Sequence, residues 1–599
     1  MNMTTSLFDP AIQQVLNQSR ANNGSLFHSP EDWRDVPIYF LLLDRFNNPV
    51  APPRNLPFDA PFSQFQGGTY RGVIARLDYI KSLGFGALWL SPVLKNRQSD
   101  PAAYHGYGIQ NFITAEPRFA SHPANADSEL RELVDEAHKR GLYVIFDIVL
   151  HHAGDVFEYA TGNAATDWQN QKIGLRWRNA NGDGNPAWTN APANPPFDAA
   201  VFPDELRHNE LFTAQGNCLS NGGQVGGDFM TLKGVNFDAP QNLRPASEIL
   251  ILAYQYVIAR FDVDAFRIDT LKFIPRDFER TFGNAMREFA LSAGKKNFFT
   301  FGEVYDNEPE IAQFIGRDTA DVNGVVGVDA ALDYPLFFVL PNALKGIGAS
   351  PTDLAQVFEN RKQVEKEVIT SHGEAGQYFV TFLDNHDQGQ RFGFTGPTQF
   401  VDQITLGLAC LASLQGVPCL YYGTEQGLSG HKHDNLNDDS MVRESLWGKP
   451  GGGFNMSHPI YVALQQVLQV RASQPALRYG RQYFRPISGN GRDFGLSPYP
   501  SGVLAFSRIL NDQEIVFIAN INRQADFNGE IIIDRQLHSG ATNMRPLFSN
   551  RRPIAGLAHS VFNKPAGSVA IHEVNGSVTN GPALTVQVQL QPGEAQLLA

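Results

Sequence analysis

Cysteine is scarce in this chain of 599 residues, which contains only Cys218, Cys410 and Cys419. An odd number of cysteines without a CxxC spacing excludes a disulfide framework and the common zinc sites, so we expect these thiols to pack in the interior. Clusters of Lys and Arg are also lacking, and the formal net charge is -13. Because a phosphate backbone requires a basic patch, this charge argues against a nucleic-acid partner.

Long apolar runs are absent as well, and no stretch reaches the length that spans a membrane. The first residues, MNMTTSLFDPAIQQVL, lack the basic start and apolar run of a secretory signal. We therefore expect a soluble, cytoplasmic protein without a membrane partner. The chain is 42% hydrophobic and 11% aromatic, which is typical of a folded protein, and its length predicts more than one domain. The oligomeric state is left open.

Short apolar runs that end in polar residues recur along the chain, and runs apolar throughout indicate strands buried on both faces. They cover residues 36–44, 85–92, 143–152, 263–269, 297–304, 378–387 and 417–425, with a weaker candidate at 322–335. Amphipathic stretches at 71–84 and 128–141 lie between them, and each ends in Gly, as a helix C-terminus does. Alternating strands and helices predict an α/β fold, and eight strands close a (β/α)8 TIM barrel.

Two regions break this alternation. Residues 153–240 are loop-rich and are predicted to form a domain inserted after the third strand. Beyond about residue 478 the pattern changes to short alternating strands, which predicts a C-terminal antiparallel β-sandwich domain. The expected organisation is an N-terminal extension (1–34), the barrel (35–152 and 241–477), the insert (153–240) and the β domain (478–599).

Three carboxylates follow strands of the predicted barrel: Asp269, Glu303 and Asp387. The carboxyl ends of barrel strands meet at one face, where barrel enzymes place their active sites. Arg267 lies two residues before Asp269 and should point to the same side. We expect its positive charge to lower the pKa of Asp269, while the apolar run before Glu303 favours the protonated form of that carboxyl.

Histidines and a tyrosine accompany these carboxylates. His386 precedes Asp387, His152 ends the run that contains Asp147, and Tyr107 offers a flat face for a sugar ring. Taken singly, each has a plainer interpretation: an Asp–Arg pair is usually a salt bridge, and a lone His or aromatic residue usually packs. Packing is also the favoured interpretation of the tryptophans in the insert, which are Trp168, Trp177 and Trp188.

Four segments occur in an order that carries a resemblance. DIVLHH (147–152), DAFRIDTLK (264–272), FGEVYD (301–306) and FLDNHD (382–387) match the ordered motifs of the α-amylase family of glycoside hydrolases, and TLKGVN (231–236) corresponds to a fifth. The chain resembles that family over roughly residues 35–475.

The resemblance implies a role for each matching residue. Asp269 would be the nucleophile, Glu303 the general acid/base and Asp387 the third carboxylate, which holds ring hydroxyls. The subsite for the cleaved sugar would be lined by Arg267, His152, His386, Tyr107 and His105. Asp147 would support the site, and Lys272 would contact the leaving-group side. The chemistry would need no cofactor.

Calcium binding, common in this family, is left open. His151 stands where the family usually has a calcium-binding Asn, and Phe273 where calcium-binding members often have His. Imidazole is a poor replacement because calcium prefers hard oxygen ligands. A loop with Asp44, Asn47 and Asn48 is another candidate, although such loops are more often plain turns.

The leading hypothesis is a retaining glycoside hydrolase that cleaves α-1,4-glucosidic bonds in starch- or glycogen-type glucans or maltooligosaccharides. An α-glucosidase or a glucanotransferase with the same carboxylates is the nearest alternative, and a non-catalytic carbohydrate-binding protein is a remote one. The C-terminal domain either caps the barrel or binds starch. Endo or exo action and tolerance of α-1,6 branches are not predicted.

Overall fold

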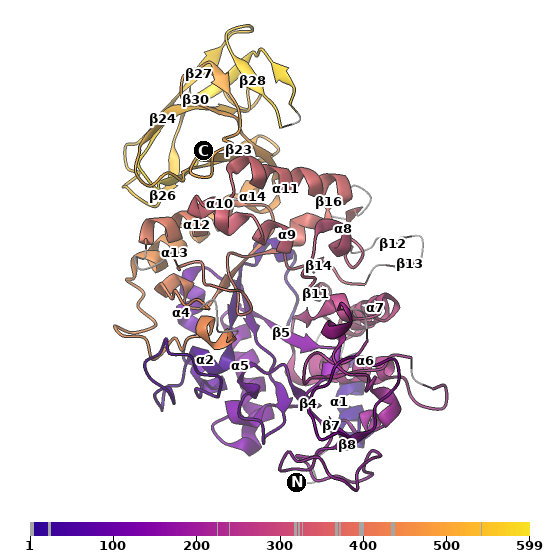
Figure 1. Cartoon of the computed structure of the whole chain (residues 1–599). Helices are drawn as coiled ribbons and strands as arrows, with labels where there is room; N and C mark the ends of the chain where they lie inside the picture. Colours follow the sequence, from indigo (N-terminus) through magenta and orange to yellow (C-terminus); the bar gives the residue numbers. More distant parts are fainter. Residues whose placement is uncertain are drawn as a thin grey trace.

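The computed structural model describes residues 5–21, 26–223, 226–238, 240–316, 320–321, 324–325, 327–365, 369–370, 373–394, 400–432, 438–540, 542–574 and 576–599. In the larger part of the molecule, helices surround a central sheet. The C-terminal sheets lie at the opposite end of the molecule from the N-terminus (Figure 1). In the part of the chain that is described, no helix is long and apolar enough to span a membrane.

Eight parallel strands form the central sheet, in the order β14-β11-β10-β5-β2-β1-β18-β17. A parallel bridge between Leu332 and Val380 joins its two ends, so the sheet closes into the predicted barrel. The strands are β1 (Ile38–Leu41), β2 (Ala87–Leu90), β5 (Tyr143–Val149), β10 (Ala265–Asp269), β11 (Phe299–Gly302), β14 (Ala330–Ala331), β17 (Val380–Thr381) and β18 (Val417–Tyr421). Each falls within a predicted run. Residues 322, 323 and 326 of the weaker run lie outside the described residues.

Helices cover the outside of the barrel. The longest are α5 (Ala126–Lys139), α6 (Ala246–Phe261), α7 (Arg276–Ser292), α11 (Pro351–Val364), α12 (Val401–Ser413) and α13 (Pro459–Ser473). Shorter ones are α1 (Pro10–Ala21), α2 (Leu43–Phe46), α3 (Tyr70–Ile74), α4 (Leu77–Leu83), α8 (Glu308–Ile311), α9 (Tyr334–Phe337), α10 (Leu340–Lys345) and α14 (Pro475–Tyr479).

The stretch at 71–84 is two helices, α3 and α4, rather than one. The side chain of Asn47 donates to the carbonyl of Gly72 at 2.9 Å, and the amide of Arg76 donates to Val73 instead. The i to i−4 ladder is therefore interrupted at this point. Gly84 ends α4 in the left-handed region with φ of 106°, as predicted for a helix C-terminus.

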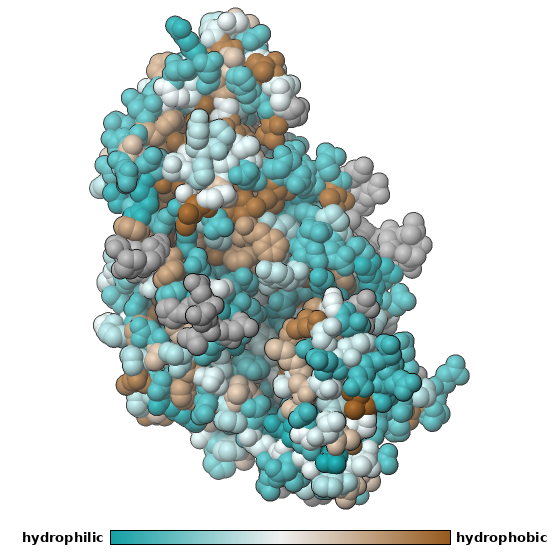
Figure 2. Space-filling view, in the orientation of Figure 1, coloured by the Kyte–Doolittle hydropathy of each residue, from teal (hydrophilic) through white to brown (hydrophobic). Residues whose placement is uncertain are grey.

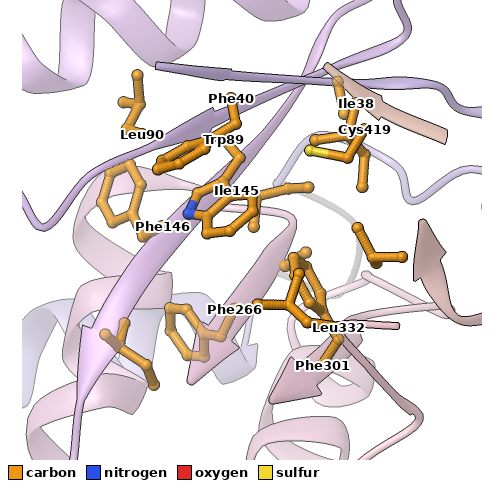
Figure 3. Packing of buried hydrophobic residues seen from close by; sticks show 14 of the residues in the cluster. Ile38, Phe40, Trp89, Leu90, Ile145, Phe146, Phe266, Phe301, Leu332 and Cys419 are labelled. Carbon is orange, nitrogen blue, oxygen red and sulfur yellow. The ribbon is translucent and has the colours of Figure 1, made fainter. Parts of the chain in front are cut away.

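Large apolar side chains fill the barrel interior (Figure 3). The rings of Phe40 and Trp89 stack with centroids 3.8 Å apart, and Phe301 meets Trp89 edge-on at 5.5 Å. Cys218, Cys410 and Cys419 are all buried, which confirms the packing role predicted for them. Trp177 is also buried in the insert, as expected for a packing residue. A filled barrel leaves only its open face for a site.

The insert holds short strands joined by loops. β6 (His152–Ala153) pairs with β9 (Lys233–Gly234), and β7 (Phe157–Tyr159) pairs with β8 (Leu175–Trp177). Because β6 directly follows the third barrel strand, the insert rises from the face where the site residues were predicted.

The C-terminal part forms two five-stranded antiparallel sheets, β19-β22-β23-β31-β26 and β20-β24-β30-β27-β25, as predicted for a β-sandwich. Their strands are β19 (Arg481–Phe484), β20 (Ile487–Ser488), β22 (Val503–Leu510), β23 (Gln513–Asn520), β24 (Phe527–Ile533), β25 (Asn543–Met544), β26 (Pro546–Ser549), β27 (His559–Lys564), β30 (Ala583–Leu590) and β31 (Ala595–Leu598). In Figure 2 the visible face is largely hydrophilic, with hydrophobic patches near the level where these sheets meet the barrel.

Candidate active site

A cleft of about 670 Å³ opens at the carboxyl ends of the barrel strands. It is lined by seven of the predicted site residues: His105, Tyr107, His152, Asp269, Lys272, Glu303 and Asp387. Arg267, Asp147 and His386 lie directly behind this lining, in contact with it. The structure thus brings all ten predicted residues together. The volume of the cleft is in the range of small-molecule sites.

One guanidinium joins three carboxylates in the floor of the cleft. Arg267 is only 1% exposed; its Nη1 lies 2.9 Å from Asp147 Oδ1 and 2.8 Å from Asp269 Oδ1, and its Nη2 lies 3.0 Å from Glu303 Oε2. The register explains this meeting, because Arg267 pairs with Asp147 on β5 and with Phe301 on β11. Adjacent parallel strands therefore end with their polar residues side by side.

Arg267 lowers the pKa of Asp269, as expected, but the net shift of that pKa is upward. Burial raises the pKa of Asp269 well above its ordinary value, and the Glu303 and Asp147 carboxyls raise it further, although Arg267 opposes them. Burial likewise raises the pKa of Asp147 to about 7. A single cation does not balance three buried carboxylates, so we infer that the cluster keeps at least one proton near neutral pH.

Glu303 receives donors on both of its oxygens. The Thr270 amide donates to Oε2 at 3.1 Å, and the Tyr334 hydroxyl donates to Oε1 at 3.1 Å. Thr270 has φ of 49°, a left-handed conformation that is strained for a β-branched residue. This conformation accompanies the approach of its N–H to the carboxylate. On the same side, Lys272 Nζ contacts Asp306 at 2.7 Å.

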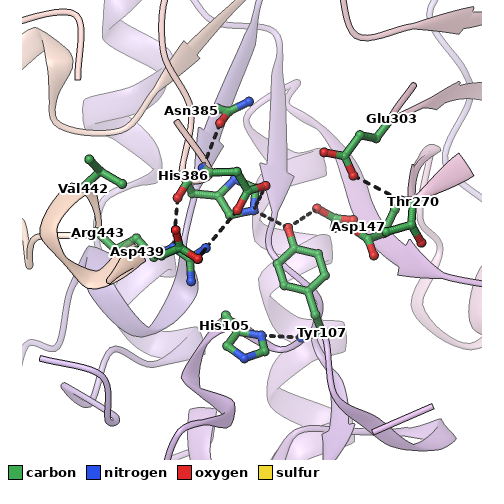
Figure 4. Close-up of polar contacts among 12 residues, drawn as sticks. His105, Tyr107, Asp147, Thr270, Glu303, Asn385, His386, Asp439, Val442 and Arg443 are labelled. Atoms are coloured by element: carbon green, nitrogen blue, oxygen red, sulfur yellow. Dashed lines mark hydrogen bonds and ion pairs between the residues drawn. The ribbon is translucent and has the colours of Figure 1, made fainter. Parts of the chain in front are cut away.

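A second chain of polar contacts crosses the cleft (Figure 4). Tyr107 donates to Asp147 Oδ2 at 2.9 Å, and His386 Nε2 lies 2.7 Å from the Tyr107 oxygen and 3.1 Å from Asp387 Oδ2. Because Tyr107 uses its proton on Asp147, His386 must carry its proton on Nε2. Arg443 Nη2 holds Asp387 Oδ1 at 2.9 Å.

The histidines of the site are neutral. Burial lowers the pKa of His105 to about 3, and it lowers the pKa values of His152 and His386 well below the ordinary range. His105 Nδ1 accepts the Tyr107 amide at 3.0 Å, and the His152 ring lies parallel to Phe229. Neutral imidazoles and aromatic faces are suited to an uncharged, hydroxyl-rich ligand.

Several lining residues were not predicted, among them Tyr334, Arg443, Thr270 and Asp439. Tyr334 follows β14, a barrel strand of two residues, and Arg443 lies in irregular chain after β18. Neither position carries a periodic signal. Only the placement of Thr270 directly after Asp269 offered a hint.

The residues at the family's usual calcium position do not fit that ion. His151 is buried, burial lowers its pKa to about 4, and its ring faces Phe273, so hard oxygen donors are missing at both substituted positions. At the other candidate position, Asp44 lies on α2 rather than in a turn, and its two oxygens accept the amides of Gln66 and Gly67, which are distant in sequence. Within the described residues, no group of three or more His, Cys, Asp or Glu is arranged to hold a metal ion.

Comparison with known proteins gives consistent matches. A family model described as "Alpha amylase, catalytic domain" matches residues 28–200 and 228–466. An alpha-amylase of Streptomyces lividans is 27% identical over 497 residues, which cover 76% of this chain and 50% of that protein. The chain thus spans about half the length of this relative. A cyclomaltodextrin glucanotransferase of Klebsiella oxytoca is 26% identical over 514 residues, covering 78% and 70%.

Among solved structures, an alpha-amylase of Geobacillus thermoleovorans, complexed with acarbose, superposes with a TM-score of 0.62 at 22% identity. The match covers 95% of this chain and 99% of that one. At this identity the likeness establishes the fold, and the chemistry must be argued from the cleft.

Proposed function

Because this chain belongs to the alpha-amylase family, we propose that it is a retaining glycoside hydrolase of α-1,4-glucans or maltooligosaccharides. One observation carries this function: Asp269 and Glu303 end adjacent strands, open into the same cleft and lie within 3.0 Å of the same guanidinium. Retention requires a nucleophile and an acid about 5 to 5.5 Å apart, which such neighbours can satisfy.

The proposed reaction assigns a task to each carboxyl group. Glu303 protonates the departing glycosidic oxygen while Asp269 attacks the anomeric carbon, forming a covalent glycosyl ester. Glu303 then takes a proton from the attacking water, and the ester is hydrolysed. Asp387, beside the neutral His386, holds ring hydroxyls and favours the distorted ring of the transition state. The first step needs the protonated form of Glu303 and the ionised form of Asp269.

The nucleophile assignment predicts the behaviour of Asp269→Asn. An amide cannot form the glycosyl ester, so we expect hydrolysis of maltoheptaose to fall by roughly a thousandfold or more. Reducing-sugar release and a thermal unfolding curve measure activity and folding together. Asp277→Asn is the matched control, because its side chain is fully exposed on α7. Near-normal hydrolysis by Asp269→Asn contradicts the assignment.

Transfer to a sugar acceptor is the second candidate, favoured by an aromatic face beside Glu303. Tyr305 is 56% exposed and Phe338 is 41% exposed, and their ring centroids lie 5.1 Å apart. Such a face suits stacking of an acceptor sugar, which would compete with water. Products from maltoheptaose separate the outcomes: short fragments indicate hydrolysis, glucose alone an α-glucosidase, and longer or cyclic products a glucanotransferase. Parallel digests of starch and pullulan, with and without a chelator, test branch tolerance and calcium.

A further inference from the structure

The two oxygens of Glu303 have chemically different partners. Oε2 faces Arg267 Nη2 at 3.0 Å and the Thr270 amide at 3.1 Å. A guanidinium and a backbone amide are donors only, with no lone pair to accept a proton. When Glu303 is protonated, its hydrogen must therefore lie on Oε1.

Oε1 contacts a group of the other kind. The Tyr334 hydroxyl donates to it at 3.1 Å, and a hydroxyl is both donor and acceptor. The Asn385 amide in turn hydrogen-bonds to the Tyr334 hydroxyl. Asn385 is fixed in place because its Oδ1 accepts the amide of Asp387 at 2.9 Å. Tyr334 thus links the strand ends that carry Glu303 and Asp387.

A buried ion pair between Asp333 and Arg361 holds the backbone next to Tyr334 in place. Asp333, the preceding residue, receives Arg361 Nη1 at 2.9 Å and also contacts Nη2, and its own amide donates to Val380 on β17 at 3.0 Å. Arg361 Nε contacts Glu308 on α8 at 2.7 Å. The ion pair therefore joins α11, α8 and the end of β14, next to the tyrosine that lines the cleft.

On the premise that Glu303 is the acid/base of the proposed function, we propose that Tyr334 is its positioning residue and that Oε1 is the oxygen that delivers the proton. The hydroxyl stabilises the ionised carboxylate and aims Oε1 into the cleft. The Asp333–Arg361 pair holds the hydroxyl in that place. Nothing in the overall reaction changes: one proton leaves Oε1 with the departing sugar and one returns from water.

The test compares Tyr334→Phe with wild type on two substrates. Maltoheptaose needs protonation of its leaving group, whereas α-maltosyl fluoride releases fluoride with little help from an acid. We expect kcat/KM for maltoheptaose to fall about 10- to 100-fold, and that for the fluoride by less than about threefold. The alkaline limb of the maltoheptaose profile should move up by about one pH unit, because the lost donor favoured the ionised carboxylate.

The other charged or titratable groups facing Glu303 stay unchanged in this variant: Arg267 and Asp269 from β10, Asp147 from β5 and the neutral His386. Tyr254→Phe is the control, since its buried hydroxyl donates to the Val149 carbonyl at 2.7 Å rather than to Glu303. A merely structural loss would reduce both substrates equally, as we expect for this control.

A readout without substrate separates the inference from the proposed function. Infrared difference spectra against Glu303→Gln isolate the protonated-carboxyl band of Glu303, and in Tyr334→Phe this band should persist to higher pH. An unchanged band, or equal losses on both substrates, overturns the role of Tyr334. If the wild-type chain cleaves neither substrate, the proposed hydrolase function is wrong. The infrared shift still tests whether Tyr334 stabilises the ionised form of Glu303.

Discussion

Glu279 on α7 is a carboxyl group that the proposed reaction does not use. It is 1% exposed, its Oε1 accepts the Val328 amide at 2.8 Å, and Oε2 has no hydrogen-bond partner among the described residues. Burial raises its pKa to about 8, against the pull of Arg280, Arg287 and Arg276. The folded chain therefore holds this proton at neutral pH.

This proton predicts how stability depends on pH. The folded state keeps it up to about pH 8, whereas the unfolded chain releases it near 4.5, so the free energy of unfolding falls as pH rises between these values. The loss is at most several kcal/mol, at about 1.4 kcal/mol per pH unit. Glu279→Gln should reduce the slope measured by urea unfolding between about pH 5 and about pH 8 by about 1.4 kcal/mol per pH unit. Glu288→Gln, an exposed change on the same helix, should keep it. An unaltered slope in Glu279→Gln contradicts the assignment.

The residues of the cleft differ in how far sequence predicts them. Asp269, Glu303 and Asp387 are predictable because each follows an apolar run that marks a strand end. Tyr334 and Arg443 are not, since their contacts depend on how irregular chain returns to the barrel. The net upward shift of the Asp269 pKa was not predicted for a related reason. It depends on the burial of three carboxylates around Arg267, and these come from three different strands.

At the scale of elements, β10 and β11 approach closely at Gly302. Ile268 pairs with Gly302, which brings the following residues, Asp269 and Glu303, side by side. A Cβ on Gly302 would lie 2.0 Å from Leu271 Cδ2 and 3.0 Å from its Cβ. The glycine therefore makes room for the turn that follows Asp269 and carries the Thr270 amide.

Gly302→Ala should displace that turn. We expect kcat to fall roughly tenfold, because a small displacement of Thr270 and Asp269 disturbs the reacting geometry. The free energy of unfolding should decrease by about 1–3 kcal/mol from overpacking. Adding Leu271→Ala removes the clashing side chain and should restore part of the kcat. Steady-state kinetics on maltoheptaose decide the matter, and a double variant no better than the single one contradicts this cause.

The barrel strands were predictable because parallel strands buried on both faces are apolar throughout. β14 gave the weakest signal because Gly324, Gly327 and Asp329 interrupt the apolar run before it. The division of α3 from α4 was not predictable, because it arises from the side chain of Asn47, which is distant in sequence and takes a carbonyl of the helix. The periodicity of residues 71–84 alone cannot predict a contact with a residue outside that stretch.

At the scale of the whole molecule, the sheet that contains β22 and β23 is apolar on both faces. Along β23, Ile515, Phe517 and Ala519 belong to the core shared with the barrel, whereas Val516 and Ile518 belong to the core of the sandwich. Side chains of a strand alternate between its faces, so one sheet serves two cores. The continuous apolar run in this strand was visible in the sequence. This packing favours the capping role of the C-terminal sheets.

Arg508 on β22 ties these sheets to the barrel and provides a test of that coupling. It is 1% exposed; Nη1 donates to the Ser413 carbonyl on α12 at 2.9 Å, and Nη2 donates to the Gly480 carbonyl at 2.9 Å. Arg508→Ala leaves both buried carbonyls without these donors and opens a cavity, so we expect the free energy of unfolding to fall by about 3–5 kcal/mol. Arg545→Ala, at an exposed position between β25 and β26, should change it by less than about 0.5 kcal/mol. Calorimetry and limited proteolysis between barrel and sheets follow the effect together. If Arg508→Ala unfolds like wild type, the apolar face alone holds the two parts together, and the guanidinium contributes nothing beyond it.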